Sequence, residues 1–426
     1  MNNKYETNDL MIDVVIVGAG LAGIMTSYEL LKNNPRLKVL IVEKTNNLGG
    51  ALITTGGVFM AHTSSVHKRD HVDTTLDILK EHLALSSKKE LDSKLIDNIF
   101  IKAPYVLDLF IDNGLNIYKH SLSNAINNNI NSYWVKDAGK GFVEFIKNFV
   151  VNNNIDIRYD TKLTDLIYDN NEVKGIVVQS NNQEYNIFAH KVVLACGGFI
   201  HNSKLVLKYN SNIKDNRLVT APNFMTGDAF SIVSKLDVAV TGDGTMGGLK
   251  TENNRAPIPA KVIVNELGER FTNEKYATYW IQRDLLDHNS LFAYFINDSS
   301  YDTSSLDNNA FVKYDSLAEL ASCNKIPLDK LEQSIKQINI ELKAPYYISK
   351  TVYTSFGALT ALKTNSNLQL VDNSGKPIAN LYGAGDIVVS NAFTTRYPGG
   401  GFGISFAASS GAFLGEYLAS NTLGDN

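Results

Sequence analysis

The stretch Met11-Ile12-Asp13-Val14-Val15-Ile16-Val17-Gly18-Ala19-Gly20-Leu21-Ala22-Gly23 decides the fold of this chain of 426 residues. Its first part, from Ile12 to Val17, is almost entirely apolar and β-branched, which is typical of a strand buried on both faces. From Leu21 onward the apolar residues recur at helical spacing. The stretch therefore predicts a strand, a tight glycine turn and a helix.

The glycine turn matches the phosphate-binding turn of a dinucleotide fold. Its glycines are Gly18, Gly20 and Gly23. They allow the tight turn, the approach of a pyrophosphate and close packing of a helix whose first N–H groups carry partial positive charge. A second buried strand is predicted from Lys38 to Val42, and Glu43 follows it, twenty residues beyond Gly23. Because a carboxylate at this place can accept hydrogen bonds from an adenosine ribose, the segment is predicted to bind a dinucleotide.

The chain has 40 basic and 44 acidic side chains, so it lacks the excess of positive charge that binding to nucleic acid or an anionic membrane requires. No apolar run approaches the roughly 18 residues that a membrane span needs. Residues 1–10 are polar and lack the pattern of a signal peptide. Cys196 and Cys323 have neither disulfide-framework nor metal-site spacing. We therefore expect a cytoplasmic protein with a small-molecule partner and no metal.

The length of the chain predicts two domains. Residues 70–149 are expected to be mainly helical, apart from an Asn-rich surface loop at 124–131. Residues 155–195 are expected to form a β-meander that returns to the main sheet. We predict a doubly wound α/β, Rossmann-like domain formed by residues 1–235 and 353–426, interrupted by a substrate or cap domain of α+β type at 236–352.

Further motifs, most of them glycine-rich, follow the opening turn. They are Leu48-Gly49-Gly50-Ala51, Thr54-Thr55-Gly56-Gly57, Ala195-Cys196-Gly197-Gly198-Phe199, Thr226-Gly227-Asp228, the stretch from Val264 to Glu274, and Leu381-Tyr382-Gly383-Ala384-Gly385-Asp386. Over nearly the whole chain this set resembles the flavoprotein family (FAD-binding 2 type) of soluble fumarate reductases, succinate dehydrogenase flavoproteins and 3-ketosteroid dehydrogenases. The resemblance implies FAD as the cofactor, a two-part FAD-binding domain and a cap that closes over the flavin.

The resemblance also implies a set of cofactor-binding residues. They are Gly18, Gly20, Leu21, Ala22, Gly23, Glu43, Lys44, Gly49, Gly50, Ala51, Thr55, Gly56, Gly57, Leu163, Ala195, Cys196, Gly197, Asp228, Gly385, Asp386, Gly400, Gly401, Gly403 and Ile404. In membrane-complex members of the family a histidine tethers the flavin covalently, whereas this chain has Gly50, Ala51 and Leu52 in that region. We therefore expect non-covalent FAD.

The chemistry implied by the resemblance is hydride transfer between flavin N5 and a substrate carbon, paired with proton transfer at the neighbouring carbon. It makes or removes a C=C bond next to a carbonyl or carboxylate. Thr251, Glu252 and Arg255 match a fumarate reductase motif in which the threonine contacts the substrate carboxylate and the other two relay protons. Arg396 matches the arginine that clamps a substrate carboxylate, a role that a guanidinium fork suits. The chain is thus expected to be a C=C reductase or a dehydrogenase.

Two departures weaken the match to fumarate reductases. Their proton-donating arginine falls at Thr278 here, and their histidine is missing from the segment that begins at Tyr353. The ketosteroid dehydrogenases have a Tyr-Pro-Gly-x-Gly motif, present here from Tyr397, and a tyrosine base near the arginine position, where Tyr276 and Tyr279 lie. We therefore predict Tyr279, Tyr397 and Tyr353 as catalytic candidates, because a tyrosine hydroxyl can move a proton or polarise a carbonyl.

Several alternatives stay open at this level. An aromatic set would suit a substrate bulkier than a four-carbon diacid: Tyr353, Phe356, Phe393, Tyr397, Phe402 and Phe406. The reaction direction, the substrate and the electron donor or acceptor are left open, and no second GxGxxG turn marks a nicotinamide site. A flavin oxidase acting on a CH–N bond is a second interpretation, and a non-catalytic flavin electron-transfer protein is a third.

Overall fold

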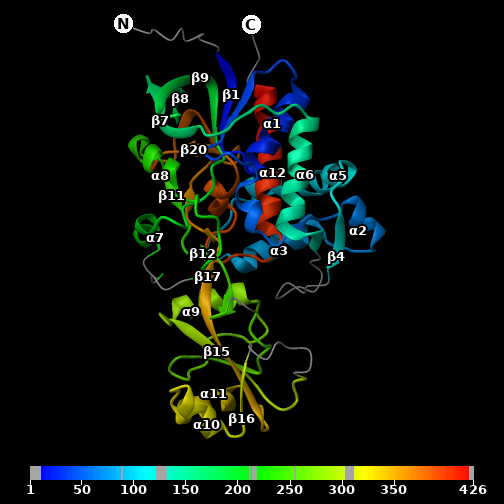
Figure 1. Ribbon diagram of the computed structural model, residues 1–426, viewed down its shortest axis with the longest axis vertical. Helices are drawn as coiled ribbons and strands as arrows, with labels where there is room; N and C mark the ends of the chain where they lie inside the picture. The colour runs from blue at the N-terminus through cyan, green and yellow to red at the C-terminus, as the bar shows by residue number, and fades with distance from the viewer. Residues whose placement is uncertain are drawn as a thin grey trace.

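The computed structural model describes residues 11–87, 90–120, 132–210, 213, 218–253, 256–302 and 311–421. Figure 1 shows two lobes: the larger contains β1, α1 and α12, and the smaller contains β15, α10 and α11. The strand labelled β17 extends from the region between the lobes into the smaller one (Figure 1).

The larger lobe is built on an eight-stranded sheet with the order β20-β21-β8-β9-β1-β2-β6, in which β7 also pairs with β8. The strands are β1 (Ile12–Val17), β2 (Val39–Val42), β6 (Ile157–Arg158), β7 (Lys162–Asp169), β8 (Glu172–Ser180), β9 (Gln183–Leu194), β20 (Gln369–Val371) and β21 (Pro377–Gly383). β1 lies between β2 and β9 and is parallel to both, with Val15 opposite Leu40 and Val192. The apolar run in β1 is buried, as a central strand of a parallel sheet requires. The predicted doubly wound α/β fold is confirmed.

The β-meander predicted for residues 155–195 is also present. β7 pairs antiparallel with β8, and β8 pairs antiparallel with the first half of β9. The second half of β9 joins the parallel part of the sheet, where Leu194 lies opposite both Val17 of β1 and Gly383 of β21. The meander therefore ends with its last residues beside the glycine turn.

Two helices far apart in sequence pack against each other in this lobe. Its helices are α1 (Leu21–Asn33), α2 (Ser65–Arg69), α3 (Leu76–Ser86), α4 (Ser93–Phe100), α5 (Ala103–Asp112), α6 (Ala138–Asn152), α7 (Ser203–Tyr209), α8 (Asp228–Val233) and α12 (Phe402–Asn421). α12 lies along α1 (Figure 1), and Gly411 permits the close approach, since a Cβ there would lie 2.3 Å from the carbonyl oxygen of Ala22. The last part of the chain thereby completes the domain that the first part begins.

The expectation that residues 70–149 are mainly helical needs a correction. This region also contains β4 (Ile117–His120) and β5 (Ser132–Val135), which form a three-stranded antiparallel sheet with β3 (Val58–Met60). Pairing of β5 with a strand more than seventy residues away leaves no local signal in the sequence. The Asn-rich loop at 124–131 lies outside the described residues.

The smaller lobe has a six-stranded sheet with the order β10-β17-β15-β14, and β13 and β16 also pair with β17. Its elements are β10 (Leu218–Val219), β13 (Leu249–Thr251), β14 (Val262–Asn265), α9 (Thr278–Asp287), β15 (Phe292–Asn297), β16 (Val312–Tyr314), α10 (Leu317–Cys323), α11 (Leu328–Gln337) and β17 (Tyr346–Ser355). A separate apolar core includes Val264, Ile296 and Leu331. Because β17 runs past residue 352, the expected boundary falls inside a strand, and the division into domains stays a prediction.

Two short ribbons lie where the chain enters and leaves the smaller lobe. β11 (Val240–Thr241) pairs with β19 (Ala361–Leu362), and β12 (Thr245–Met246) pairs with β18 (Gly357–Ala358). Among the helices of the described ranges, none combines the length and apolar character that crossing a bilayer demands.

Candidate cofactor and substrate site

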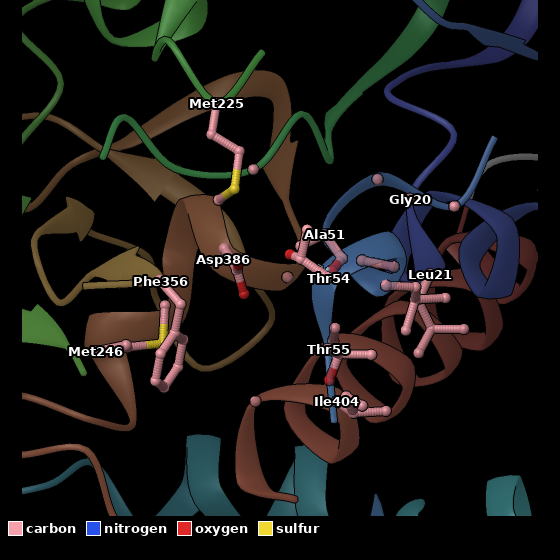
Figure 2. A pocket seen from close by; sticks show the side chains of 18 of the residues that line it. Gly20, Leu21, Ala51, Thr54, Thr55, Met225, Met246, Phe356, Asp386 and Ile404 are labelled. Atoms are coloured by element: carbon pink, nitrogen blue, oxygen red, sulfur yellow. Dashed lines mark hydrogen bonds between the residues drawn. The ribbon is translucent and has the colours of Figure 1, made fainter. Parts of the chain in front are cut away.

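A cavity of about 700 Å³ lies where the carboxyl ends of four parallel strands meet. The residues that follow these strands and line the cavity are Gly18 after β1, Glu43 after β2, Ala195 after β9 and Gly385 after β21. This edge of an open α/β sheet is where such folds bind ligands. Figure 2 shows the cavity between Gly20 and Leu21 on one side and Met246 and Phe356 on the other.

The N-terminus of α1 faces this cavity without a capping side chain. Gly20 is the N-cap residue, no side chain of the described residues caps the free N–H groups, and the first turn contains no acidic residue. A Cβ on Gly20 would meet no atom within 4 Å and would project into open space, whereas one on Gly23 would lie 2.1 Å from the carbonyl oxygen of Gly18. The first glycine therefore leaves room for a ligand and the second permits packing, so this end of the cavity suits a pyrophosphate.

Glu43 is held by the turn that it faces. One carboxylate oxygen accepts a hydrogen bond from the N–H of Ala19 at 2.9 Å, and the other accepts from the N–H and the hydroxyl of Thr45, both at 2.9 Å. The oxygen that accepts from Ala19 retains a second lone pair, and the side chain lines the cavity. Glu43 can therefore accept a further hydrogen bond from a ribose hydroxyl.

Lys44, the next residue, is tied to the far side of the cavity. Its Nζ lies 2.8 Å from Asp228 and 3.0 Å from the hydroxyl of Thr226. Burial alone would raise the pKa of the Asp228 carboxyl, but the hydrogen bond and charge of Lys44 outweigh burial and lower the pKa. Burial raises the pKa of the nearby Cys196 thiol to about 12, so this residue is a neutral thiol. The ion pair fixes the wall around the predicted adenosine end.

Asp386 lies at the middle of the cavity. It belongs to the 3₁₀ helix Gly385–Asn391, which follows β21. Figure 2 shows its carboxyl group directed into the space between Phe356 and Thr54. Burial raises the pKa of this carboxyl to about 6. Such a group can bind a hydroxyl-rich chain, because it accepts hydrogen bonds when ionised and can also donate one when protonated.

Most of the predicted cofactor residues line this one cavity. They are Gly18, Gly20, Leu21, Ala22, Glu43, Lys44, Gly49, Gly50, Ala51, Thr55, Gly56, Leu163, Ala195, Cys196, Gly197, Asp228, Gly385, Asp386, Gly400, Gly401, Gly403 and Ile404. The remaining two, Gly23 and Gly57, serve packing, since a Cβ on Gly57 would lie 2.7 Å from the Cα of Ala138. The described residues thus fit an extended dinucleotide, and no histidine is among those that line the cavity.

Two tyrosines meet at the other end of the cavity. The rings of Tyr279, on α9, and Tyr397 lie 5.4 Å apart in an edge-to-face arrangement, and both residues line the cavity. The hydroxyl of Tyr397 accepts a hydrogen bond from the N–H of Gly403 at 3.1 Å. Burial raises the pKa of both hydroxyls, so both are neutral near pH 7. This end therefore presents neutral phenol groups beside the glycine-rich turn before α12.

Part of the wall near the two tyrosines is apolar. Figure 2 shows Met246 and Phe356 beside each other on this wall. The ring of Phe356 lies 5.3 Å from that of Tyr397, edge to face. Thr278, at the position of the family's proton-donating arginine, also lines the cavity. The chemistry of this end suits a mostly apolar substrate body.

Arg396 does not line the cavity. Its guanidinium group donates a hydrogen bond to Asp284 and lies 5.4 Å from the ring of Trp280, and its side chain is 15% exposed. Because Trp280 and Asp284 are one turn apart on α9, they hold the guanidinium between them. Arg283 is engaged likewise, with Asp287 at 2.9 Å and Asp243 at 3.4 Å.

The other catalytic candidates among the described residues also lie away from the cavity wall. Thr251 is buried in β13 opposite Thr351 of β17. Glu252 is largely exposed and forms an ion pair with Lys350 at 2.8 Å. Tyr353 is buried in β17. Arg255 lies outside the described residues. The structure therefore brings Tyr279 and Tyr397 to the cavity, and these roles stay predictions.

Some cavity residues were not predicted from the sequence. The charged ones are Lys162 and Lys250, and large apolar ones include Phe224, Met225 and Met246. Lys162 starts β7 directly before Leu163, a residue that the resemblance implied as cofactor-binding. Lys250 and Met246 belong to no motif, and the pairing of β13 with β17 and of β12 with β18 brings them to this place. Met225 directly precedes the motif Thr226-Gly227-Asp228.

The comparisons with known proteins agree with this geometry. The model of the FAD binding domain family matches residues 13–404. The urocanate reductase of Eggerthella lenta is 23% identical, over 88% of this chain and 69% of that protein. The NADH:acrylate oxidoreductase of Vibrio harveyi is 24% identical over 59% of this chain, which spans only 29% of that protein.

A solved structure covers the whole fold. The 3-ketosteroid delta1-dehydrogenase from Sterolibacterium denitrificans, in complex with 1,4-androstadiene-3,17-dione, superposes with a TM-score of 0.80 at 16% identity. The match covers 96% of this chain and 100% of that one. The likeness includes both lobes and shows that they form one known type of fold.

Proposed function

The chain belongs to the FAD-binding domain family, and we propose that it is an oxidoreductase acting on the CH–CH or C=C bond next to a carbonyl. In the reducing direction a hydride and a proton add across the C=C bond, and in the other direction both leave. Bound FAD supplies the hydride chemistry. The residues of this chain bind the cofactor, orient the substrate and hold the proton.

The paired tyrosines carry the proposal. Tyr279 and Tyr397 are the predicted catalytic residues that line the cavity, at the end opposite Glu43. A phenol hydroxyl with a raised pKa is a hydrogen-bond donor at pH 7, so Tyr397 can polarise a substrate carbonyl while Tyr279 gives or takes the proton. A Cβ on Gly400 would lie 3.8 Å from the hydroxyl oxygen of Tyr279, which places this hydroxyl beside the glycine turn.

The engagement of Arg396 supports a ketone substrate over a dicarboxylate. An arginine that clamps a carboxylate must present its N–H groups to the cavity. Here Asp284 accepts from that guanidinium, and Trp280 covers its face. Met246 and Phe356 supply an apolar wall instead. We therefore propose an α,β-unsaturated ketone, or the saturated ketone, as the substrate class.

Lys250 favours a second candidate substrate class. This lysine lines the cavity with Thr278 and Tyr279, on the same wall as the proposed substrate end. Its ammonium group could bind the carboxylate of an unsaturated acid, as a point charge rather than a fork. The relatives include a urocanate reductase and an acrylate oxidoreductase, so an unsaturated carboxylate stays the alternative.

Other properties follow as proposals. The cavity has glycine, alanine and leucine where a covalent tether would need a histidine, which supports non-covalent FAD. The electron donor or acceptor is proposed to be a separate molecule that reaches the flavin through the open cavity. The free thiols of Cys196 and Cys323 support a cytoplasmic location.

A half-reaction experiment tests the proposed function. Photoreduced protein is mixed anaerobically with 2-cyclohexen-1-one, a steroid enone, fumarate, acrylate or urocanate, and oxidised protein with the saturated counterparts. The flavin absorbance reports each reaction. Fast reaction with an enone or ketone is expected. Reaction with acids alone would favour the second class, and no reaction in either direction would contradict both.

A further inference from the structure

His82 lies at the junction of three elements that carry the tyrosine end of the cavity. It is buried on α3, and one ring nitrogen, Nε2, lies 2.7 Å from the carbonyl oxygen of Pro398. Its ring stacks on Phe402, the first residue of α12, at 5.3 Å and 16°. It also lies 5.9 Å from the ring of Trp280 on α9.

Each contacted residue is next to a residue of the proposed site. Pro398 follows Tyr397, Trp280 follows Tyr279, and Phe402 lies between Gly401 and Gly403. These neighbours all line the cavity, whereas His82 does not. A displacement of the imidazole would therefore move both tyrosines and the glycine turn together.

The protonation state of His82 follows from its partners. A carbonyl oxygen can only accept a hydrogen bond, so Nε2 must carry the proton that it donates to Pro398. The other nitrogen, Nδ1, is buried without a hydrogen-bond partner in the described part of the chain. Burial lowers the pKa of the ring, and the hydrogen bond to Pro398 offsets only part of that effect. We therefore expect His82 to be neutral, with its proton on Nε2.

A second contact strengthens the same junction. Ser87, at the end of α3, forms a hydrogen bond of 2.5 Å with the hydroxyl of Thr394 in the segment before Arg396. α3 therefore holds the segment from Thr394 to Pro398 at two points. The hydrogen bond from His82 is the one that fixes the carbonyl between Tyr397 and the glycine turn.

We propose that His82 is a positioning residue, whose neutral Nε2–H imidazole sets the glycine turn and the pair Tyr279–Tyr397 in place for FAD and substrate. The effect on FAD is independent of the substrate class. The effect on catalysis rests on the proposed function and deepens it.

The experiment compares His82→Leu, which removes the donor, with His82→Gln, which keeps an N–H at a similar reach. His62→Leu is the matched control: His62 is also a buried histidine of this lobe, with Nε2 at 3.0 Å from the carbonyl oxygen of Phe100, but it lies away from the cavity wall. Titration of each apoprotein with FAD gives the dissociation constant, and thermal unfolding gives Tm. If His82→Leu does not fold, His82→Asn, whose amide is too short to reach Pro398, replaces it.

The FAD dissociation constant is expected to rise about tenfold in His82→Leu or His82→Asn, a change of about 1.4 kcal/mol. It should stay within about threefold of the parent in His82→Gln, and His62→Leu should lower Tm without changing FAD affinity. Equal loss in His82→Gln and His82→Leu, equal loss in His62→Leu, or unchanged FAD affinity in all variants would overturn the proposal. Because these readouts need no substrate, they remain decisive even if no ketone or acid reacts.

Discussion

Arg396 and Asp284 form an ion pair that turns the guanidinium group away from the cavity wall. Both side chains are mostly buried, at 15% and 13% exposure, and Thr272 donates a second hydrogen bond to Asp284 at 2.8 Å. An arginine that matches a family's substrate clamp by position is thus held as a structural link between α9 and the segment before α12.

The first prediction concerns this ion pair. Arg396→Ala leaves the Asp284 carboxylate buried without its cation, which is expected to destabilise the protein by about 3 kcal/mol. Affinity for fumarate and acrylate, measured from the flavin absorbance change, should not change. Urea unfolding gives the stability. A large loss of carboxylate affinity with unchanged stability would show that the arginine acts as a clamp after all.

A second prediction uses the open space at Gly20. In Gly20→Val the new side chain enters the phosphate end of the cavity, where even a Cβ meets no atom within 4 Å. FAD affinity is expected to fall about tenfold or more, with little change in the Tm of the apoprotein. Gly198→Ala is the control, because Gly198 lies beside the cavity but not on its wall. Unchanged FAD affinity in the valine variant would place the pyrophosphate elsewhere.

The raised pKa of Asp386 gives a third prediction. A carboxyl whose folded pKa of about 6 exceeds its ordinary value of 3.8 binds its proton more tightly in the folded state. The apoprotein therefore loses stability as pH rises from about 4 to 6, and the loss is complete above pH 6. Asp386→Asn should be more stable than the parent by roughly 3 kcal/mol at pH 7 but not at pH 4. Urea unfolding at both pH values measures this, and a less stable variant at pH 7 would refute it.

A fourth prediction separates the two substrate classes. Lys250→Met removes the ammonium group from the cavity wall, and it should weaken binding of an unsaturated acid about tenfold while leaving enone binding unchanged. Lys350→Met is the control, since Lys350 pairs with Glu252 away from the cavity. Ligand titrations monitored by flavin absorbance give both affinities. If acid binding is unchanged, Lys250 plays no part in recognition.

The sequence alone was sufficient to predict residues that line the cofactor end of the cavity, because they follow strands directly, and their binding of FAD stays a prediction. Gly18, Glu43 and Gly385 each come just after an apolar run, and parallel strands bring their ends to one edge. The fold of this lobe was predictable for the same reason. The short strands β4 and β5 were not, because their pairing partner β3 is distant in sequence.

The substrate end was predicted only in part. Tyr279 and Tyr397 follow recognisable motifs, but the orientation of Arg396 depends on Asp284 and Trp280 of α9, which lie more than one hundred residues away. The contact of His82 with Pro398 spans 316 residues and has no sequence pattern. The direction of both side chains depends on contacts between segments that are far apart in sequence. The spacing of motifs gives no information about such contacts.

The most direct measurement is the single-turnover rate of flavin reaction with the best substrate in Tyr279→Phe, against Tyr276→Phe. Tyr276 is a neighbouring tyrosine that packs on Trp280 and does not line the cavity. The account predicts a rate at least about a hundredfold lower in Tyr279→Phe, with FAD still bound, and a near-normal rate in Tyr276→Phe. An unchanged rate in Tyr279→Phe, with FAD bound, would contradict the proposed role of the tyrosine pair.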